Sequence, residues 1–120
     1  MLMSIGADLV DVKRIGKSIR DPRFLARIYT KQEISYCRSK ANAAQHFAVR
    51  FAAKEAVWKA LSDLNVKGVG HKEIGVKRAA SGKPSVSLSR RLKKYEKKIS
   101  LSLSHTKDNA IAVAIFQDRP

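Results

Sequence analysis

Apolar and polar positions alternate in four short stretches of the chain, a pattern that predicts β-strands. These stretches cover residues 4–12, 73–79, 85–88 and 99–103, and a further apolar stretch covers residues 110–116. The polar turn at residues 104–109 predicts that the last two stretches pair as an antiparallel hairpin. Because residues 110–116 are apolar at nearly every position, we expect this strand to be buried on both faces.

Helical signals fill the region between the first two strands. The start signals Asp21-Pro22, and Thr30 followed by Glu33, predict two short helices, because these residue types cap or open helices. The longest helical pattern covers residues 42–61 and is apolar almost all round. Such a helix packs on several sides, either within the core or in a subunit interface.

Four charged residues interrupt this apolar helix: Arg50, Lys54, Glu55 and Lys59. Charges in such a place are costly unless they are paired or bound to an ion. One interpretation is an ion pair between Glu55 and Lys59, one helical turn apart. The other joins Glu55 with Asp8, which lies on an apolar strand, around a cation. Enzymes that act on phosphates hold Mg²⁺ through only one or two carboxylates, with waters and substrate oxygens. The helical pattern favours neither interpretation.

Length and composition narrow the class of protein. The chain has 120 residues, 44% of them hydrophobic, which predicts a single domain over residues 1–120 with one core. It contains no apolar run of about 20 residues, so we expect no membrane span. The amino end lacks the features of a secretory signal, and we expect a cytoplasmic protein. The lone cysteine, Cys37, excludes a disulfide within the chain and is expected to be an inert, partly buried thiol.

A strong positive charge points to polyanionic partners. Lys and Arg number 25 against 10 Asp and Glu, for a net charge of +15. Basic residues gather in a short segment, residues 13–20, and in a predicted helix at residues 90–98 that Ser89 would cap. Nucleic acid, a phosphate-rich small molecule and an acidic protein are all compatible with this charge. Only 7% of residues are aromatic, and the chain shows no RNA-recognition strand or recognition helix, which argues against a nucleic-acid-binding module.

Several segments, taken in order, resemble the holo-acyl-carrier-protein synthases, the small bacterial 4′-phosphopantetheinyl transferases. They are Ile-Gly-Ala-Asp-Leu-Val-Asp-Val-Lys-Arg-Ile at 5–15, residues 23–30 with Glu33, Arg-Phe-Ala-Ala-Lys-Glu-Ala at 50–56 with Lys59-Ala60, Gly-Lys-Pro at 82–84, and Ser-Leu-Ser-His-Thr-Lys-Asp at 102–108 with 110–113. The resemblance covers essentially the whole chain. One departure is that residues 61–65, Leu-Ser-Asp-Leu-Asn, stand where the family has a Gly-Thr-Gly turn, with glycines only later, at 68 and 70.

The resemblance implies a fold and a reaction. The fold is α+β, with an antiparallel sheet wrapped around the long central helix, in a trimer whose active sites are shared between neighbouring subunits. The reaction is transfer of 4′-phosphopantetheine from coenzyme A to a serine of apo-acyl carrier protein, with release of adenosine 3′,5′-bisphosphate. A catalytically silent relative that only binds carrier proteins is a further alternative, against which the presence of Asp8, Glu55 and Lys59 speaks.

The resemblance also assigns roles to residues of this chain. Asp8 and Glu55 would hold Mg²⁺ against the coenzyme A pyrophosphate, and Lys59 would contact the phosphates, so these three form the catalytic set. Positive charge around the phosphates would come from Arg50 and Lys54 as well. The nucleotide end would be lined by Gly82, Lys83, Pro84, Ser104, His105 and Thr106. The acidic carrier protein would dock on Arg14, Arg20, Arg23, Phe24 and Arg27. As general base, a metal-bound water, or Glu55 acting through one, fits better than His105.

Overall fold

The computed structural model describes residues 2–78 and 81–118, and all statements below concern these residues. The elements, in order, are β1 (Leu2–Asp11), α1 (Val12–Ser18), α2 (Pro22–Ile28), α3 (Lys31–Arg38), α4 (Ala43–Asp63), the 3-10 helix η1 (His71–Glu73), β2 (Ile74–Arg78), β3 (Pro84–Leu88), the 3-10 helix η2 (Arg90–Lys98), β4 (Ile99–His105) and β5 (Asn109–Asp118). The Gly82 position at the tip of the β2–β3 turn has a φ of 85°, which favours glycine.

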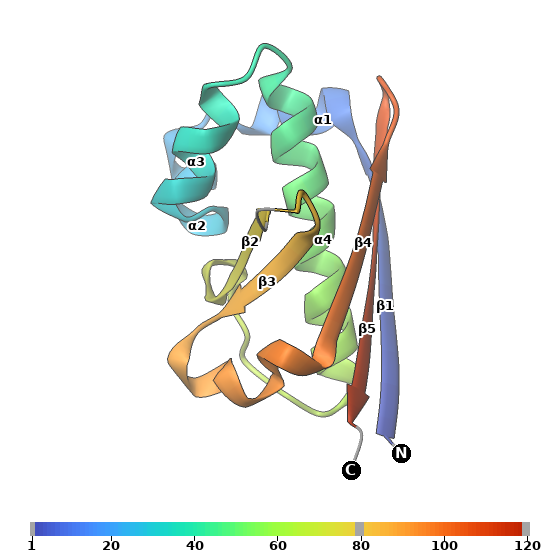
Figure 1. Ribbon diagram of the computed structural model, residues 1–120. Helices are drawn as coiled ribbons and strands as arrows, with labels where there is room; N and C mark the ends of the chain where they lie inside the picture. The colour runs from blue at the N-terminus through green and yellow to red at the C-terminus, as the bar shows by residue number, and fades with distance from the viewer. Residues whose placement is uncertain (1, 79–80, 119–120) are drawn as a thin grey trace.

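The long helix α4 lies between two antiparallel sheets (Figure 1). A three-stranded sheet in the order β1-β5-β4 covers one side, and the two-stranded β2-β3 sheet continues around the helix from the β4 edge, with β3 beside β4 and β2 against α4 (Figure 1). The short helices α1, α2 and α3 gather beside the amino-terminal half of α4. The predicted α+β fold is therefore confirmed, with its strands divided between two sheets.

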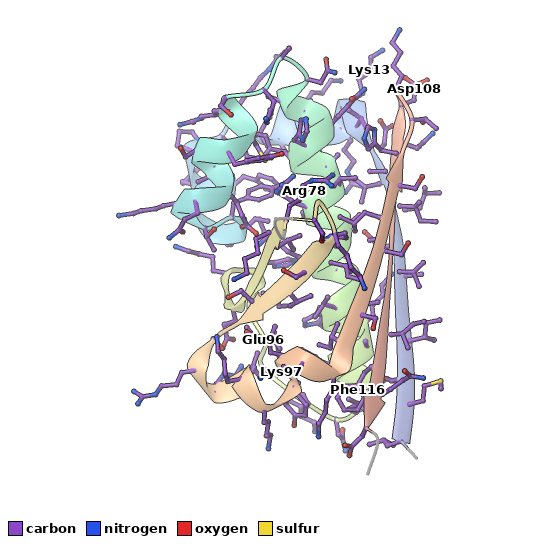
Figure 2. All side chains as sticks on the ribbon, in the orientation of Figure 1. Lys13, Arg78, Glu96, Lys97, Asp108 and Phe116 are labelled. Atoms are coloured by element: carbon purple, nitrogen blue, oxygen red, sulfur yellow. The ribbon has the colours of Figure 1, made fainter. Side chains whose placement is uncertain are left out.

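The predicted hairpin between β4 and β5 is confirmed, but the burial predicted for β5 is wrong. The residues of β5 that face α4 are buried: Ala110, Ala112, Ala114 and Phe116. On the opposite face Ile111 is 41% exposed, and on the same face of β1 Leu9, which pairs with Ile111, is 68% exposed and Ile5 is 63% exposed. The reason is that helices cover only one side of the sheet within a single chain. Side chains stand off the uncovered side along its whole length (Figure 2).

Small residues bring β1 unusually close to α4. A Cβ atom at Gly6 would lie 2.0 Å from the carbonyl oxygen of Ala56 and 2.9 Å from the amide nitrogen of Ala60. Two residues earlier, the Ser4 hydroxyl donates a hydrogen bond to the carbonyl oxygen of Ala60 at 2.9 Å. The strand therefore lies directly on the helix backbone. Asp8, two residues after Gly6 on the same face, is consequently held beside the middle of α4.

Local capping explains two elements that the sequence pattern described incompletely. Most of residues 13–20, expected only as a basic segment, belong to helix α1 (Val12–Ser18). The helix begins here because the Asp11 carboxylate accepts hydrogen bonds from the amides of Lys13 and Arg14. At its other end α4 finishes in a Schellman motif. The amide of Val66 donates to the carbonyl of Leu61, and Asn65 adopts a φ of 68°. Asn65 thus takes the left-handed position that glycine usually takes.

The predicted cap of the basic helix is wrong. Residues 90–98 form a 3-10 helix, and the Ser89 side chain makes no capping hydrogen bond. Its hydroxyl instead donates to Glu73 Oε1 at 2.8 Å. Ser89 therefore bonds to Glu73 of η1, just before β2, a partner that sequence spacing does not reveal.

Candidate functional site

Asp8 and Lys59 meet where β1 crosses α4. Lys59 Nζ lies 3.3 Å from Asp8 Oδ1 and donates a second hydrogen bond, of 2.9 Å, to the carbonyl oxygen of Ala7. The Asp8 side chain is 19% exposed, whereas that of Lys59 is 45% exposed. The ammonium group is therefore held by the strand yet still reaches solvent, where an anionic ligand can approach it.

Glu55 is paired with a histidine and not with Lys59. The Glu55 Oε1 atom lies 2.9 Å from Nε2 of His71, a residue of η1. Lys59, one turn along the helix, points instead to β1. The interpretation of an isolated ion pair between Glu55 and Lys59 is thus wrong, because each has a closer partner from another element.

The negative charge of Glu55 acts on the carboxylate of Asp8. Burial raises the pKa of Asp8 above its ordinary value, Lys59 opposes the rise, and the charge of Glu55 adds to it. A raised pKa means that the ionised carboxylate is disfavoured as the site stands. A cation bound between the two groups would relieve both the burial and the repulsion.

The donor set of Asp8 and Glu55 suits a hard divalent ion held partly by other oxygens. Among residues 2–78 and 81–118, no group of three or more His, Cys, Asp or Glu side chains could hold a metal ion. Two carboxylates alone are a typical protein contribution to a Mg²⁺ site that substrate phosphates complete. The residues present therefore fit an Mg²⁺ ion only if substrate oxygens complete its coordination.

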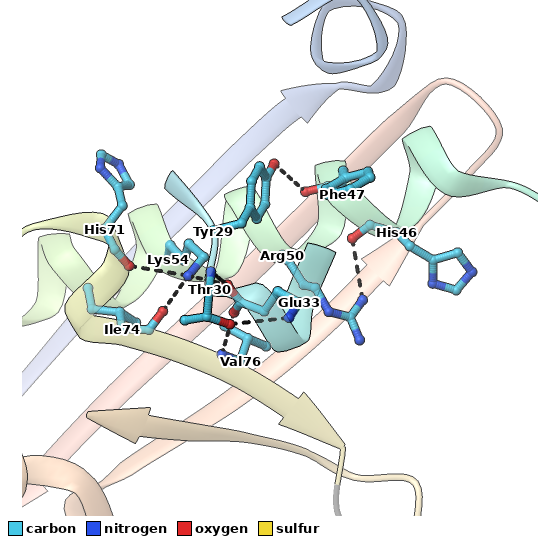
Figure 3. Close-up of polar contacts among 10 residues, drawn as sticks. All are labelled: Tyr29, Thr30, Glu33, His46, Phe47, Arg50, Lys54, His71, Ile74 and Val76. Atoms are coloured by element: carbon cyan, nitrogen blue, oxygen red, sulfur yellow. Dashed lines mark hydrogen bonds and ion pairs between the residues drawn. The ribbon is translucent and has the colours of Figure 1, made fainter. Parts of the chain in front are cut away.

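Lys54 does not contribute to this site, because it is fully buried on another side of α4 (Figure 3). Its ammonium group lies 2.7 Å from Glu33 Oε1 and donates to the carbonyl oxygen of Ile74 at 2.6 Å. Glu33 also accepts hydrogen bonds from the amides of Thr30 and Val76. The pair joins α3, α4 and β2. The positive charge of Lys54, expected near a phosphate, is therefore paired with Glu33 within the core.

The segments predicted to line a nucleotide lie away from the two carboxylates. Ser104 and His105 end β4, and Thr106 follows in the turn. Because the strand order is β1-β5-β4, they occupy the sheet edge opposite Asp8, about 10 Å away at two strand spacings. Ser104 lies on the uncovered face, opposite Ile111, and His105 lies on the helix side. Gly82 and Lys83 are exposed in the turn that leads into Pro84, and Gly82 accepts a 2.8 Å hydrogen bond from Arg78.

A cluster of positive side chains surrounds His46 near the amino end of α4. Burial and the charges of Arg50, Lys40, His105 and Arg78 all lower the pKa of His46. Arg50 and His105 are among the residues expected at the nucleotide end, whereas Lys40, His46 and Arg78 were not singled out from the sequence. The only sequence signal for them was the one-turn spacing of His46 and Arg50 and the place of Arg78 just before the Gly-Lys-Pro turn.

Arg50 is itself almost completely buried. Its guanidinium lies over the Tyr36 ring, 4.4 Å from the centroid, and Nη1 donates to the carbonyl oxygen of His46 at 3.3 Å. Arg50 and Arg78 line a cavity of about 620 Å³ between α3 and the β2–β3 hairpin. A cavity of this size is in the range that small ligands occupy.

Comparison with known proteins decides the family. Residues 4–115 match the family model described as the 4′-phosphopantetheinyl transferase superfamily. The chain belongs to this superfamily. It is 41% identical over 125 residues to the holo-[acyl-carrier-protein] synthase of Koribacter versatilis, covering 98% of this chain and 100% of that protein. The resemblance inferred from the motifs is thus confirmed, and with it the expectation of an enzyme.

Solved structures of the superfamily agree with this fold. The holo-[acyl-carrier-protein] synthase of Helicobacter pylori, in complex with coenzyme A, superposes with a TM-score of 0.79 at 31% identity, over 94% of this chain and 99% of that one. The enzyme from Bacillus anthracis, in complex with CoA (3′,5′-ADP), superposes with a TM-score of 0.77 at 30% identity, over 96% and 97% of the two chains.

The predicted docking residues of this transferase lie on α1, on α2 and between them. Arg14, Arg20 and Arg27 are exposed, and the Arg23 side chain is 92% exposed with its nitrogen 3.6 Å from the capping residue Asp21. Phe24 differs from them, because its ring stacks on Phe51 at 6.1 Å and is partly buried. Phe24 therefore belongs mainly to the packing beneath this surface.

Two remaining expectations concern the thiol and the membrane. Cys37 is completely buried, not partly buried, and burial raises its pKa to about 11, which makes it unreactive. No helix among the described residues has the length and apolar character that a bilayer span requires.

Proposed function

We propose that this chain transfers the 4′-phosphopantetheine group of coenzyme A to a serine of an acidic apo-acyl carrier protein. The carrier serine oxygen forms a bond to the β-phosphorus of coenzyme A, and adenosine 3′,5′-bisphosphate leaves. The single observation that supports this best is the ion pair of Asp8 with Lys59 where β1 crosses α4, with the charge of Glu55 acting on the same Asp8 carboxylate, in a chain of the transferase superfamily.

Asp8 and Glu55 are the residues that would hold Mg²⁺, which when bound neutralises the pyrophosphate and stabilises the leaving group. The raised pKa of Asp8 supports this assignment, since burial, and to a smaller extent the charge of Glu55, raise it, and a bound cation would offset both effects. Lys59 would hold a phosphate oxygen with the exposed side of its ammonium group, while its hydrogen bond to Ala7 keeps it in place.

The serine proton passes to Glu55 through a water in this proposal, and His105 is not the base. His105 belongs to the far edge of the sheet and to the positive cluster around His46, which suits a nucleotide phosphate better than the acceptor serine. Arg50 and the 82–84 and 104–106 segments would accordingly bind the nucleotide end.

The active form in this proposal is a trimer that shares its sites between subunits. Two features of one chain support it: Asp8 on β1 and residues 104–106 at the end of β4 lie at opposite edges of the three-stranded sheet, and the face between them carries exposed apolar side chains. Monomeric proteins rarely expose a continuous apolar patch of this kind. Packing of further copies on this face would bury it and bring the two sheet edges of neighbouring chains together.

The carrier protein would dock on Arg14, Arg20, Arg23 and Arg27, with Phe24 beneath them. Their exposure supports this, because acidic partners are steered by a positive surface.

We place the reaction in the cytoplasm. The free, buried thiol of Cys37 supports this, because thiols remain reduced there.

The test incubates the protein with coenzyme A, Mg²⁺ and an apo-acyl carrier protein and weighs the carrier by mass spectrometry. We expect a gain of one phosphopantetheine group per carrier. The Asp8→Asn and Glu55→Gln variants should lose about 100-fold or more in rate. Asp63→Asn, which changes an exposed carboxylate at the end of the same helix, is the matched control and should keep the rate.

A parent protein that modifies none of several carriers would contradict the proposal. Tight RNA binding without any mass gain would favour the nucleic-acid-binding alternative. A Glu55→Gln variant with full turnover would exclude Glu55 as the route for the serine proton.

A further inference from the structure

His71 contacts a proposed metal ligand without belonging to the set of residues that the sequence motifs identified. Its Nε2 atom lies 2.9 Å from Glu55 Oε1, and the two side chains are 31% and 24% exposed. Because a carboxylate can only accept a hydrogen bond, Nε2 carries the proton and donates. Within the described ranges this is the one hydrogen bond that reaches the Glu55 side chain, and it leaves Oε2 available.

The ring of His71 is fixed on its other face by aromatic packing. It lies nearly parallel to the ring of Phe51, with centroids 5.8 Å apart and an interplanar angle of 13°. Phe51 in turn stacks on Phe24 of α2. The His71 backbone is also held, because its carbonyl oxygen accepts a 3.2 Å hydrogen bond from buried Lys54. Ring and backbone are thus restrained independently.

The short helix that carries His71 is clamped by Glu73. The Glu73 carboxylate accepts hydrogen bonds from the Gly70 amide at 3.0 Å and from Arg91 Nε and Nη2 at 2.8 and 2.9 Å. Arg91 Nη2 also donates to the carbonyl oxygen of Gly68 at 2.8 Å. The loop between α4 and η1 is therefore anchored at Gly68 and Gly70, and η1 is held at its far end by Glu73.

A free glutamate side chain on a helix samples several rotamers, and a ligand that must be ordered on binding loses affinity for its ion. Residues that hydrogen-bond to a metal-binding side chain orient it and tune the site. We propose that His71 is a positioning residue, which holds Glu55 through Oε1 so that Oε2 is presented to the divalent cation. This inference rests on the proposed function, since it assigns Glu55 to that cation.

The test compares variants that separate the hydrogen bond from the packing. His71→Phe keeps the stack on Phe51 and removes the donor. His71→Gln keeps a side-chain amide nitrogen at about the reach of Nε2, whereas His71→Asn is one methylene shorter. The probe is Mn²⁺, added to the protein in the presence of coenzyme A. Its binding is measured as the loss of the free-ion signal in electron paramagnetic resonance.

We expect the Phe and Asn variants to bind Mn²⁺ about 10- to 100-fold more weakly than the parent, and the Gln variant to recover most of the affinity. In turnover, the apparent Mg²⁺ constant should rise by a similar factor with little change in the KM for coenzyme A. Circular dichroism establishes that each variant is folded. The Gln and Asn pair carries the test if the Phe variant does not fold.

Parent-like Mn²⁺ affinity in the Phe variant, or equal affinity in the Gln and Asn variants, would overturn the role of His71. If the parent still modifies a carrier protein in that case, the proposed function stands and only this inference fails. A parent that neither binds Mn²⁺ nor modifies any carrier would overturn both.

Discussion

Gly6 shows how a single missing side chain positions a site. The proposed site needs Asp8 near Glu55, two residues that are far apart in the sequence. The carbonyl oxygen of Ala56 occupies the space where a Cβ of residue 6 would lie, 2.0 Å from it. Backbone atoms of a helix cannot yield to such a contact as the end of a flexible side chain can. The strand can lie this close only because residue 6 is glycine.

We therefore predict that Gly6→Ala destabilises the protein by about 1–3 kcal/mol, because overpacking forces β1 away from α4. Asp8 should move with the strand, and transfer activity should fall by more than the loss of folded protein explains. Urea unfolding and the carrier mass assay measure the two effects.

Gly16→Ala is the matched control at another glycine. Its added Cβ, on helix α1, would meet only the Cβ of Ala44 on α4 at 3.5 Å, an ordinary van der Waals contact. This variant should keep or raise stability, by up to about 1 kcal/mol, since alanine suits a helix better than glycine. Equal effects of the two substitutions would show that the approach of β1 to α4 is not restricted at Gly6.

At the scale of elements, the clamp between η1 and η2 gives the protein a pH dependence. Hydrogen bonds from Arg91, Gly70 and Ser89 lower the pKa of Glu73 from 4.5 to about 2. A carboxyl group with a depressed pKa stabilises the folded state above its ordinary value. That contribution is lost as the pH falls from about 4.5 toward 2, when the folded protein must also take up the proton.

Glu73→Gln should therefore lower the free energy of unfolding by about 1 kcal/mol at pH 7 and by progressively less below pH 4.5. Urea unfolding at a series of pH values measures this. Arg91→Gln is the partner variant, and the double variant should cost less than the sum of the two because they share one contact. A constant difference across the pH range would contradict the assignment of the clamp to Glu73.

The first two helices carry the proposed docking surface, and charge reversal tests it. Arg14→Glu should weaken binding of the carrier protein by about 10-fold and flatten its salt dependence, since rim charges act on encounter and orientation. Arg90→Glu makes the same change of charge on η2, at the other end of the molecule (Figure 1), and should have little effect. Equal losses from both variants would indicate a response to net charge alone.

At the scale of the whole molecule, the uncovered sheet face predicts self-association. Leu9→Lys introduces a charge at a side chain that is 68% exposed in one chain and that would be buried between copies. We expect the parent to sediment as three chains and the variant as one, with loss of transfer activity, because an unpaired buried charge is strongly disfavoured.

Ser35→Lys, an equal change at an exposed position of α3, is the control and should leave the trimer intact. Sedimentation of the parent as a single chain at micromolar concentration would contradict the trimer and the shared site together.

The sequence by itself determined the local elements and the family. The cap at Thr30 with Glu33, the β4–β5 hairpin and the long helix α4 all depend on residues close together in the chain, so their patterns are readable. Asp8 and Glu55 were candidate site residues because charges in apolar elements need a partner, and the family resemblance of residues 5–15, 50–56 and 59–60 added Lys59 to them.

Tertiary structure alone decided which partner each charge has. Lys59 reaches Asp8 across 51 positions of sequence and Lys54 enters the core to meet Glu33, while Glu55 meets His71 from a loop. The second face of β5 is uncovered because no helix formed by residues 2–78 and 81–118 packs on it. A hydropathy pattern reports that a group is apolar or charged, but pairing depends on the packing of distant elements, which no local pattern contains.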